Sequence, residues 1–167
     1  MGLLIKNFDQ FLDALNLCET GIYSYSEVLE SAADLTDEIA ELANWKQESY
    51  SREVVLKRGS FEVSILSFEP GQSTAIHQHG NQTQWLHCVV GQISREIYSK
   101  EAAGSPKLRS SSIMQNGQVT EANDQEGFQK LTNSGAERSI CIQIYNHPVG
   151  SVMAINQESG EIFELEL

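Results

Sequence analysis

Residues Phe61–Tyr98 carry the pattern that decides the fold, and they read FEVSILSFEPGQSTAIHQHGNQTQWLHCVVGQISREIY. Apolar and polar residues alternate in short runs, which are separated by a Pro-Gly pair and by a polar segment after His79. This pattern predicts short strands joined by a turn and a loop. His77 and His79 lie two residues apart at a strand end, so their imidazoles project to the same face. Two imidazoles directed at one point make half of a metal site.

The alternation continues through most of residues 47–167. Short strands broken by Gly, Pro, Asn and Ser at this spacing indicate an all-β sandwich or barrel, and closure into a jelly-roll barrel also removes exposed sheet edges. We predict strands, in chain order, at Ser51–Lys57, Phe61–Phe68, Thr74–His79, Gln84–Val90, Ile93–Tyr98, Leu108–Met114, Gln118–Ala122, Gly127–Thr132, Ser139–Tyr145, Ser151–Asn156 and Ile162–Leu165.

The segment before the strands has the period of helices. Apolar residues recur at helical spacing, first at Phe8, Phe11, Leu12 and Leu15 and again at Leu35, Ile39 and Leu42. A second short helix is predicted to begin at Ser26–Glu30, and Thr36 with Asp37 is expected to cap the third. We therefore expect two to three amphipathic α-helices in residues 1–46, packed as a flank on a β-barrel of residues 47–167, in one structural domain.

Composition restricts the partners and the compartment. The 167 residues carry a net charge of −12, from 23 acidic and 11 basic residues, and no stretch gathers Lys and Arg, so nucleic acid is not expected as a partner. No apolar run approaches 18 residues, so no membrane association is expected. Asp9 and Asp13 make the opening segment unlike a secretory signal, and Cys88 and Cys141 lie within apolar runs as reduced core thiols do. A cytoplasmic location is expected.

The spacing around the two histidines resembles the first motif of the cupin superfamily. That motif is G-x5-H-x-H-x4-E-x6-G, and it matches Gly71, His77, His79 and Gly91, with Gln84 at the glutamate position. The resemblance implies a jelly-roll barrel with a metal bound by the two histidines. Fe(II) is the expected metal, while Ni, Co, Mn or Zn suit the same ligands. The alternative is a structural or vestigial histidine pair.

A narrower resemblance is to the cysteine dioxygenase family. It rests on Tyr50-Ser51-Arg52 ahead of the H-x-H pair and on Ser139–Pro148, SICIQIYNHP, and it extends over about residues 45–157. It implies Fe(II) held by histidines, a small thiol such as cysteine as substrate, O2 as the second substrate and a sulfinic acid as product. Carried over, Arg52 would bind the substrate carboxylate through its planar fork and Tyr50 would line the pocket.

The chain departs from that family at the metal site. The position of the third ligand falls on Gln143, whose amide oxygen keeps the site neutral but is a weaker donor than imidazole. His147 and Gln84 are the alternative third ligands. Gln84 also stands where some members carry a cysteine that is cross-linked to a tyrosine, so no such cofactor is expected. The family's histidine and tyrosine beyond the proline turn align with Met153 and Ile155.

Two functions follow from these residues. The first is a metal-dependent, cysteine-dioxygenase-like enzyme, with His77, His79 and Gln143 at the metal. The second is a non-catalytic cupin that binds a small anionic ligand such as a carboxylate. His87 lies at an odd offset from Gln84, so it is expected to face away from the site, on the exterior of the barrel. A homodimer formed through a sheet edge is compatible with the resemblance.

Overall fold

The computed structural model describes residues 3–167, and of residue 124 only the backbone. Helical segments come first and strands follow, with a second short 3-10 helix, η2 (Asp124–Glu126), between two of the strands. The helical segments are α1 (Phe8–Cys18), α2 (Tyr25–Glu30), the 3-10 helix η1 (Ser31–Leu35) and α3 (Thr36–Glu41). The strands are β1 (Ser51–Lys57), β2 (Glu62–Phe68), β3 (Ile76–Gln78), β4 (Thr83–Val90), β5 (Gln92–Ser99), β6 (Lys107–Gln115), β7 (Val119–Asn123), β8 (Phe128–Thr132), β9 (Ser139–Tyr145), β10 (Ser151–Ile155) and β11 (Ile162–Glu166).

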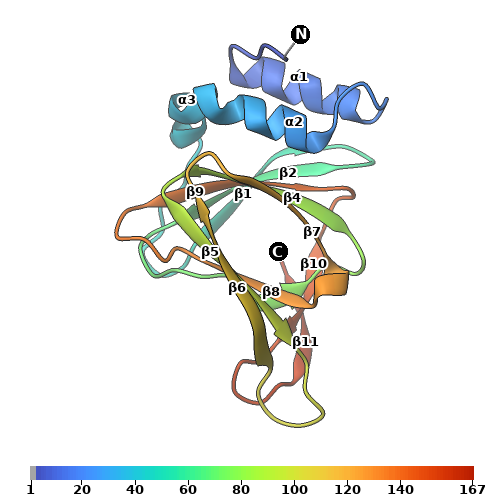
Figure 1. The fold of residues 1–167 in the computed structure, drawn as a ribbon, viewed down its shortest axis with the longest axis vertical. Coiled ribbons are helices and arrows are strands. Elements are labelled where there is room, and N and C mark those ends of the chain that lie inside the picture. Colours follow the sequence, from blue (N-terminus) through green and yellow to red (C-terminus); the bar gives the residue numbers. More distant parts are fainter. Residues whose placement is uncertain (1–2) are drawn as a thin grey trace.

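The strands form two antiparallel sheets that face each other (Figure 1). The five-stranded sheet has the order β1-β2-β9-β4-β7, and the six-stranded sheet has the order β11-β10-β3-β8-β5-β6. Every predicted strand is present, with ends that differ from the prediction by no more than two residues. The predicted β-rich barrel with N-terminal helices is therefore confirmed.

The helices cover the outer face of the five-stranded sheet (Figure 1). Alternate residues of the central strands point outward and form one core with the helices, which holds Phe11, Leu15, Leu29 and Ile39 from the helical side and Val63, Ile65, Ile140, Ile142 and Ile144 from the sheet. The Tyr25 ring of α2 lies 4.5 Å from the Trp85 ring of β4, centroid to centroid. The inward-facing residues form a second core between the sheets. Each face of this sheet is thus buried, which explains why β2 and β9 have no exposed residue.

Capping was predicted at the third helix alone, and the structure instead has a side-chain cap at α2. Ser24 begins α2 with a capping box, in which its side chain accepts from the Glu27 amide and the Glu27 carboxylate accepts from the Ser24 amide. The prediction that Thr36 caps α3 is wrong. The chain is already helical before α3, so Leu35 stands at the cap position without a side-chain bond, and the Thr36 hydroxyl donates to the Ala33 carbonyl instead.

The structure explains why Gly91, the last position of the cupin-like spacing, is a glycine. Its φ is +76°, a left-handed conformation in which a side chain is strained. A Cβ at this position would also lie 2.6 Å from the Arg138 carbonyl oxygen. Glycine is therefore required where the end of β4 passes close to the start of β9, and this junction brings the two strands that bear Gln84 and Gln143 into register.

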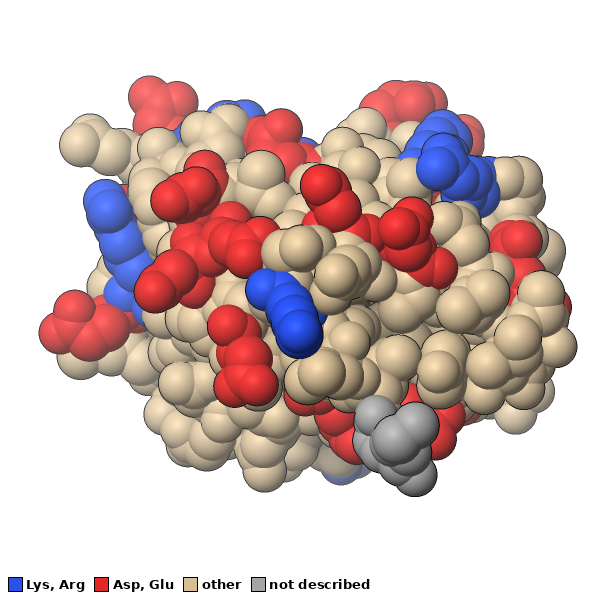
Figure 2. All heavy atoms as spheres, turned by 90° about the horizontal axis from the view of Figure 1, so that it is seen from above, with Lys and Arg blue, Asp and Glu red and all other residues tan. Residues whose placement is uncertain are grey.

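The helical side of the molecule is strongly acidic. Figure 2 shows acidic side chains spread over this face with few basic ones among them. The helices and their connections contribute nine exposed acidic residues, which are Asp9, Asp13, Glu19, Glu27, Glu30, Asp34, Asp37, Glu38 and Glu41. Among residues 3–167, no helix has the length and apolarity needed to cross a membrane.

Candidate functional site

The two histidines lie side by side inside the barrel. His77 is on β3 and His79 follows directly after it; both are buried, and their ring centroids are 4.7 Å apart in an edge-to-face arrangement. The Nδ1 atom of His77 lies 2.8 Å from the Ala75 carbonyl oxygen. This bond makes Nδ1 the protonated nitrogen and Nε2 the basic one, which is the tautomer that metal binding through Nε2 requires.

Strand β9 of the opposite sheet supplies the polar groups that face the histidines. The Tyr145 hydroxyl lies 2.9 Å from Nε2 of His79, so the two sheets meet at this contact. Gln143, two residues earlier, is buried and also faces inward, as the sequence predicted. Its amide nitrogen donates to the Gln84 side-chain oxygen over 2.9 Å, so the oxygen of Gln143 is the atom left to face a ligand. The role of Tyr145 was not predicted.

Arg52 faces the interior from β1 and forms an ion pair with Glu62, the first residue of β2. The Glu62 side chain is 1% exposed and that of Arg52 is 11% exposed. Sequence reasoning assigned Arg52 to a ligand carboxylate and overlooked Glu62, although an acidic residue at the start of the apolar run EVSILSF is an available signal. Tyr50 stacks on Phe68 at a centroid distance of 5.2 Å, and burial raises the pKa of its hydroxyl.

The resemblance placed Met153 and Ile155 at the metal site, and this is wrong, because both point away from the barrel interior. Ala154 is directly opposite His77 in the pairing of β10 with β3, so Met153 and Ile155 point to the other face of the sheet. Met153 is 41% exposed, and Ile155 packs into a cluster outside the barrel. The inward positions of β10 are Val152 and Ala154, which carry no polar side-chain atom.

The other two histidines lie outside the interior. His87 faces away from Gln84 as predicted, but the expectation that it lies on the exterior is corrected, because the helices cover this face and leave His87 0% exposed. Neither ring nitrogen of His87 has a hydrogen-bond partner, and burial lowers its pKa to about 4. His147 is exposed in the loop between β9 and β10 and takes no part in the site.

The interior fits a metal held by two imidazoles, with the Gln143 amide oxygen as the third donor, and it supplies no third imidazole. An amide oxygen binds first-row metals more weakly than imidazole does, so the affinity is expected to be lower than for three histidines. Ligation through Nε2 of His79 also requires the Tyr145 hydroxyl to leave that atom. Apart from the side chain at 124, which is not described, no group of three or more His, Cys, Asp and Glu side chains is arranged to hold a metal.

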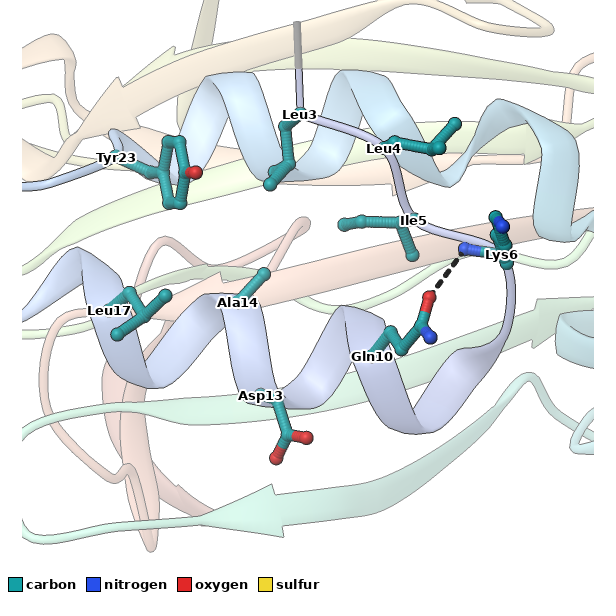
Figure 3. A pocket seen from close by; sticks show the side chains of 9 residues that line it. All are labelled: Leu3, Leu4, Ile5, Lys6, Gln10, Asp13, Ala14, Leu17 and Tyr23. Atoms are coloured by element: carbon teal, nitrogen blue, oxygen red, sulfur yellow. Dashed lines mark hydrogen bonds between the residues drawn. The ribbon is translucent and has the colours of Figure 1, made fainter.

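A cavity of about 130 Å³ opens beside His79 where β3 ends next to β10. It is lined by Gln78, His79, Gly80, Ser151, Val152 and Met153. A larger hollow of about 320 Å³ lies between the N-terminal segment and α1 (Figure 3), lined by Leu3, Leu4, Ile5, Lys6, Gln10, Asp13, Ala14, Leu17 and Tyr23. Its lining mixes polar and apolar side chains and holds no histidine, whereas the smaller cavity reaches His79 of the candidate site.

Comparison with known proteins agrees with this architecture. The sequence model of the family described as Cysteine dioxygenase type I matches residues 7–158. The chain is 25% identical to Cysteine dioxygenase type 1 of Danio rerio over 164 residues, which cover 94% of the chain and 79% of that protein. For Cysteine dioxygenase type 1 of Homo sapiens the identity is 23% over 146 residues, which cover 85% of this chain and 73% of that protein.

Solved structures support the fold. A conserved protein with a double-stranded β-helix domain from Klebsiella pneumoniae superposes with a TM-score of 0.54 at 17% identity and covers 77% of this chain and 95% of its own. A cupin superfamily protein from Desulfitobacterium hafniense superposes with a TM-score of 0.50 at 12% identity, and the match covers 65% of this chain and 87% of that protein. The two facing sheets, with a buried histidine pair between them, therefore form a cupin barrel.

Proposed function

Because the chain belongs to the cysteine dioxygenase type I family, we propose that it is a metal-dependent oxygenase that oxidises a small thiol. In the proposed reaction one O2 and one thiol give one sulfinic acid, so both oxygen atoms enter the product. Fe(II) is the proposed metal, and it would supply the redox chemistry that O2 requires. The observation that carries the proposal is the buried pair His77 and His79, which faces the polar residues of β9 across the barrel.

In this proposal the chain's own residues would hold the metal and keep water away from the substrate. His77 and His79 hold the metal through neutral imidazoles, and the Ala75 carbonyl sets the tautomer of His77. Gln143 contributes its amide oxygen, since its nitrogen is bonded to Gln84. The apolar side chains between the sheets exclude bulk water from the thiol.

The proposal includes a cytoplasmic location. Cys88 and Cys141 are free thiols that lie directly opposite each other on β4 and β9. Burial raises the pKa of both, to about 11 for Cys88, so both are protonated and unreactive. Two unbridged neighbouring thiols suit a reducing compartment.

A second candidate function is the binding of a small polar ligand without turnover. Two observations favour it: Gln143 stands where a third imidazole would be expected, and the Tyr145 hydroxyl contacts the nitrogen of His79 that would bind a metal. In this case the barrel retains the cavity of the family and not its chemistry.

Oxygen consumption separates the two candidates. Protein from iron-supplemented culture is assayed for bound iron, O2 uptake and sulfinate formation with cysteine, 3-mercaptopropionate and 2-aminoethanethiol. We expect equal amounts of O2 consumed and sulfinate formed with at least one thiol, loss of both in His77→Ala, and no change in the matched control His147→Ala, whose histidine is exposed. Iron-loaded protein that consumes no O2 with any of the three contradicts the enzymatic function and favours the binding function.

A further inference from the structure

Glu62 places a negative charge inside the barrel. Among the buried residues whose side chains the structure describes, it is the one acidic residue. In the pairing of β2 with β9 it lies directly opposite Tyr145, the residue that contacts His79. Side chains of directly paired residues point to the same face, so the Glu62 carboxylate faces the same interior as the candidate site.

Its partner is Arg52. A guanidinium within a barrel is a strong binding group for a ligand carboxylate, because its parallel N–H groups match the two carboxylate oxygens. Here Oε1 of Glu62 occupies Nη2 of Arg52. The other oxygen of Glu62 lies 4.0 Å from Nζ of Lys57, which is beyond hydrogen-bond distance. Lys57 is 62% exposed, so water screens this second pair.

Three buried polar atoms on the inner faces of the two sheets have no hydrogen-bond partner. They are Nε of Arg52, the hydroxyl of Ser64 and the amide nitrogen of Gln129. Ser64 lies two residues beyond Glu62 on β2 and directly opposite Gln143, while Gln129 is directly opposite His77. Buried donors without partners are rare in folded proteins. Their position on the inner faces of both sheets indicates that the interior accepts a polar ligand.

We propose that Glu62 determines the substrate class by occupying Arg52, so that the barrel takes a small thiol that has an amine or hydroxyl group and no carboxylate. This inference rests on the proposed function and names the substrate of the same site. A ligand carboxylate near Arg52 would meet the carboxylate of Glu62, and like charges in a poorly solvated interior repel strongly. An ammonium or hydroxyl group instead donates to the second oxygen of Glu62.

Two thiols that differ in one group test this inference. Cysteine is 2-aminoethanethiol with an added carboxylate, and propionate carries a carboxylate without a thiol. Binding of all three to the full chain is measured by anaerobic calorimetry. For the wild type we expect 2-aminoethanethiol to bind at least about tenfold more tightly than cysteine, and propionate not to bind detectably.

Substitution of Glu62 reverses the preference. In Glu62→Gln the guanidinium is released, so cysteine and propionate should gain about tenfold in affinity or more. The double variant Arg52→Gln with Glu62→Gln should lose this gain. Glu69→Gln is the matched control, because Glu69 also pairs with an arginine, Arg138, but at the surface. It should leave every affinity unchanged.

Each result decides the question. A wild type that binds cysteine as tightly as 2-aminoethanethiol overturns the inference, as does a folded Glu62→Gln protein without the gain. If Glu62→Gln does not fold, the wild-type ratio of the two thiols decides alone. If neither thiol binds the wild type, the proposed function fails, whereas a propionate gain in Glu62→Gln still supports the role of Glu62.

Discussion

Replacement of His87 tests whether a histidine buried between the helices and the barrel makes the stability of the protein depend on pH. Burial lowers the pKa of His87 from its ordinary 6.5 to about 4, and no partner stabilises its protonated form. The folded protein therefore binds fewer protons than the unfolded chain as the pH falls from 6.5 toward 4, and stability falls with the pH in this window. From these two values the loss between pH 7.5 and pH 5.0 is about 2 kcal/mol, and it approaches about 3 kcal/mol below pH 4.

Urea unfolding at both pH values measures this loss. Other groups also titrate, so the informative quantity is the difference in pH dependence between the wild type and His87→Leu. We expect the variant to lose about 2 kcal/mol less than the wild type between pH 7.5 and pH 5.0, because leucine removes the buried titration. His147→Gln, which replaces an exposed histidine, is the control and should follow the wild type. An equal loss in His87→Leu and the wild type refutes the reasoning.

Three further predictions concern the turn, the metal site and a helix cap. Gly91→Ala should lower the free energy of unfolding by about 3 kcal/mol in thermal denaturation, against about 1 kcal/mol for Gly71→Ala, because both have positive φ but only Gly91 approaches another backbone; equal losses contradict this. Gln143→His should tighten Co(II) binding about tenfold or more in anaerobic titration, and an unchanged affinity argues against Gln143 as a ligand. Ser24→Ala should remove about 1 kcal/mol of stability and Ser26→Ala less, since Ser24 makes the capping box; similar losses count against it.

The strands could be predicted because their apolar period is two and their turns carry glycine, proline and asparagine. β2 is an instructive case: its residues are all buried, since one face meets the helices and the other meets the barrel interior. The cap of α3 could not be predicted, because the 3-10 turn at Ser31–Leu35 depends on packing against the sheet and leaves Thr36 inside a helix. The burial of His87 has the same origin, since strand parity gives its face but not what covers that face.

The site could be predicted in part. Parity along β3 predicts that His77 and His79 share one face, and the family resemblance points to Gln143; the structure has all three buried on inward faces. The resemblance failed for Met153, because the pairing of β10 with β3 puts Ala154 opposite His77 and turns Met153 to the other face. The acidic start of the apolar run marks Glu62 as unusual, but its pairing with Arg52 is a tertiary contact that no spacing predicts.

Anomalous diffraction at the iron edge tests the central claim most directly. Crystals grown anaerobically with Fe(II) should show one peak per chain, within roughly 2.0–2.3 Å of a ring nitrogen of both His77 and His79, the range for first-row metals bound by nitrogen. The side-chain oxygen of Gln143 should be directed toward the same peak. A barrel without a peak at saturating Fe(II), or a peak that only one of the two imidazoles contacts, contradicts a metal centre built on this pair.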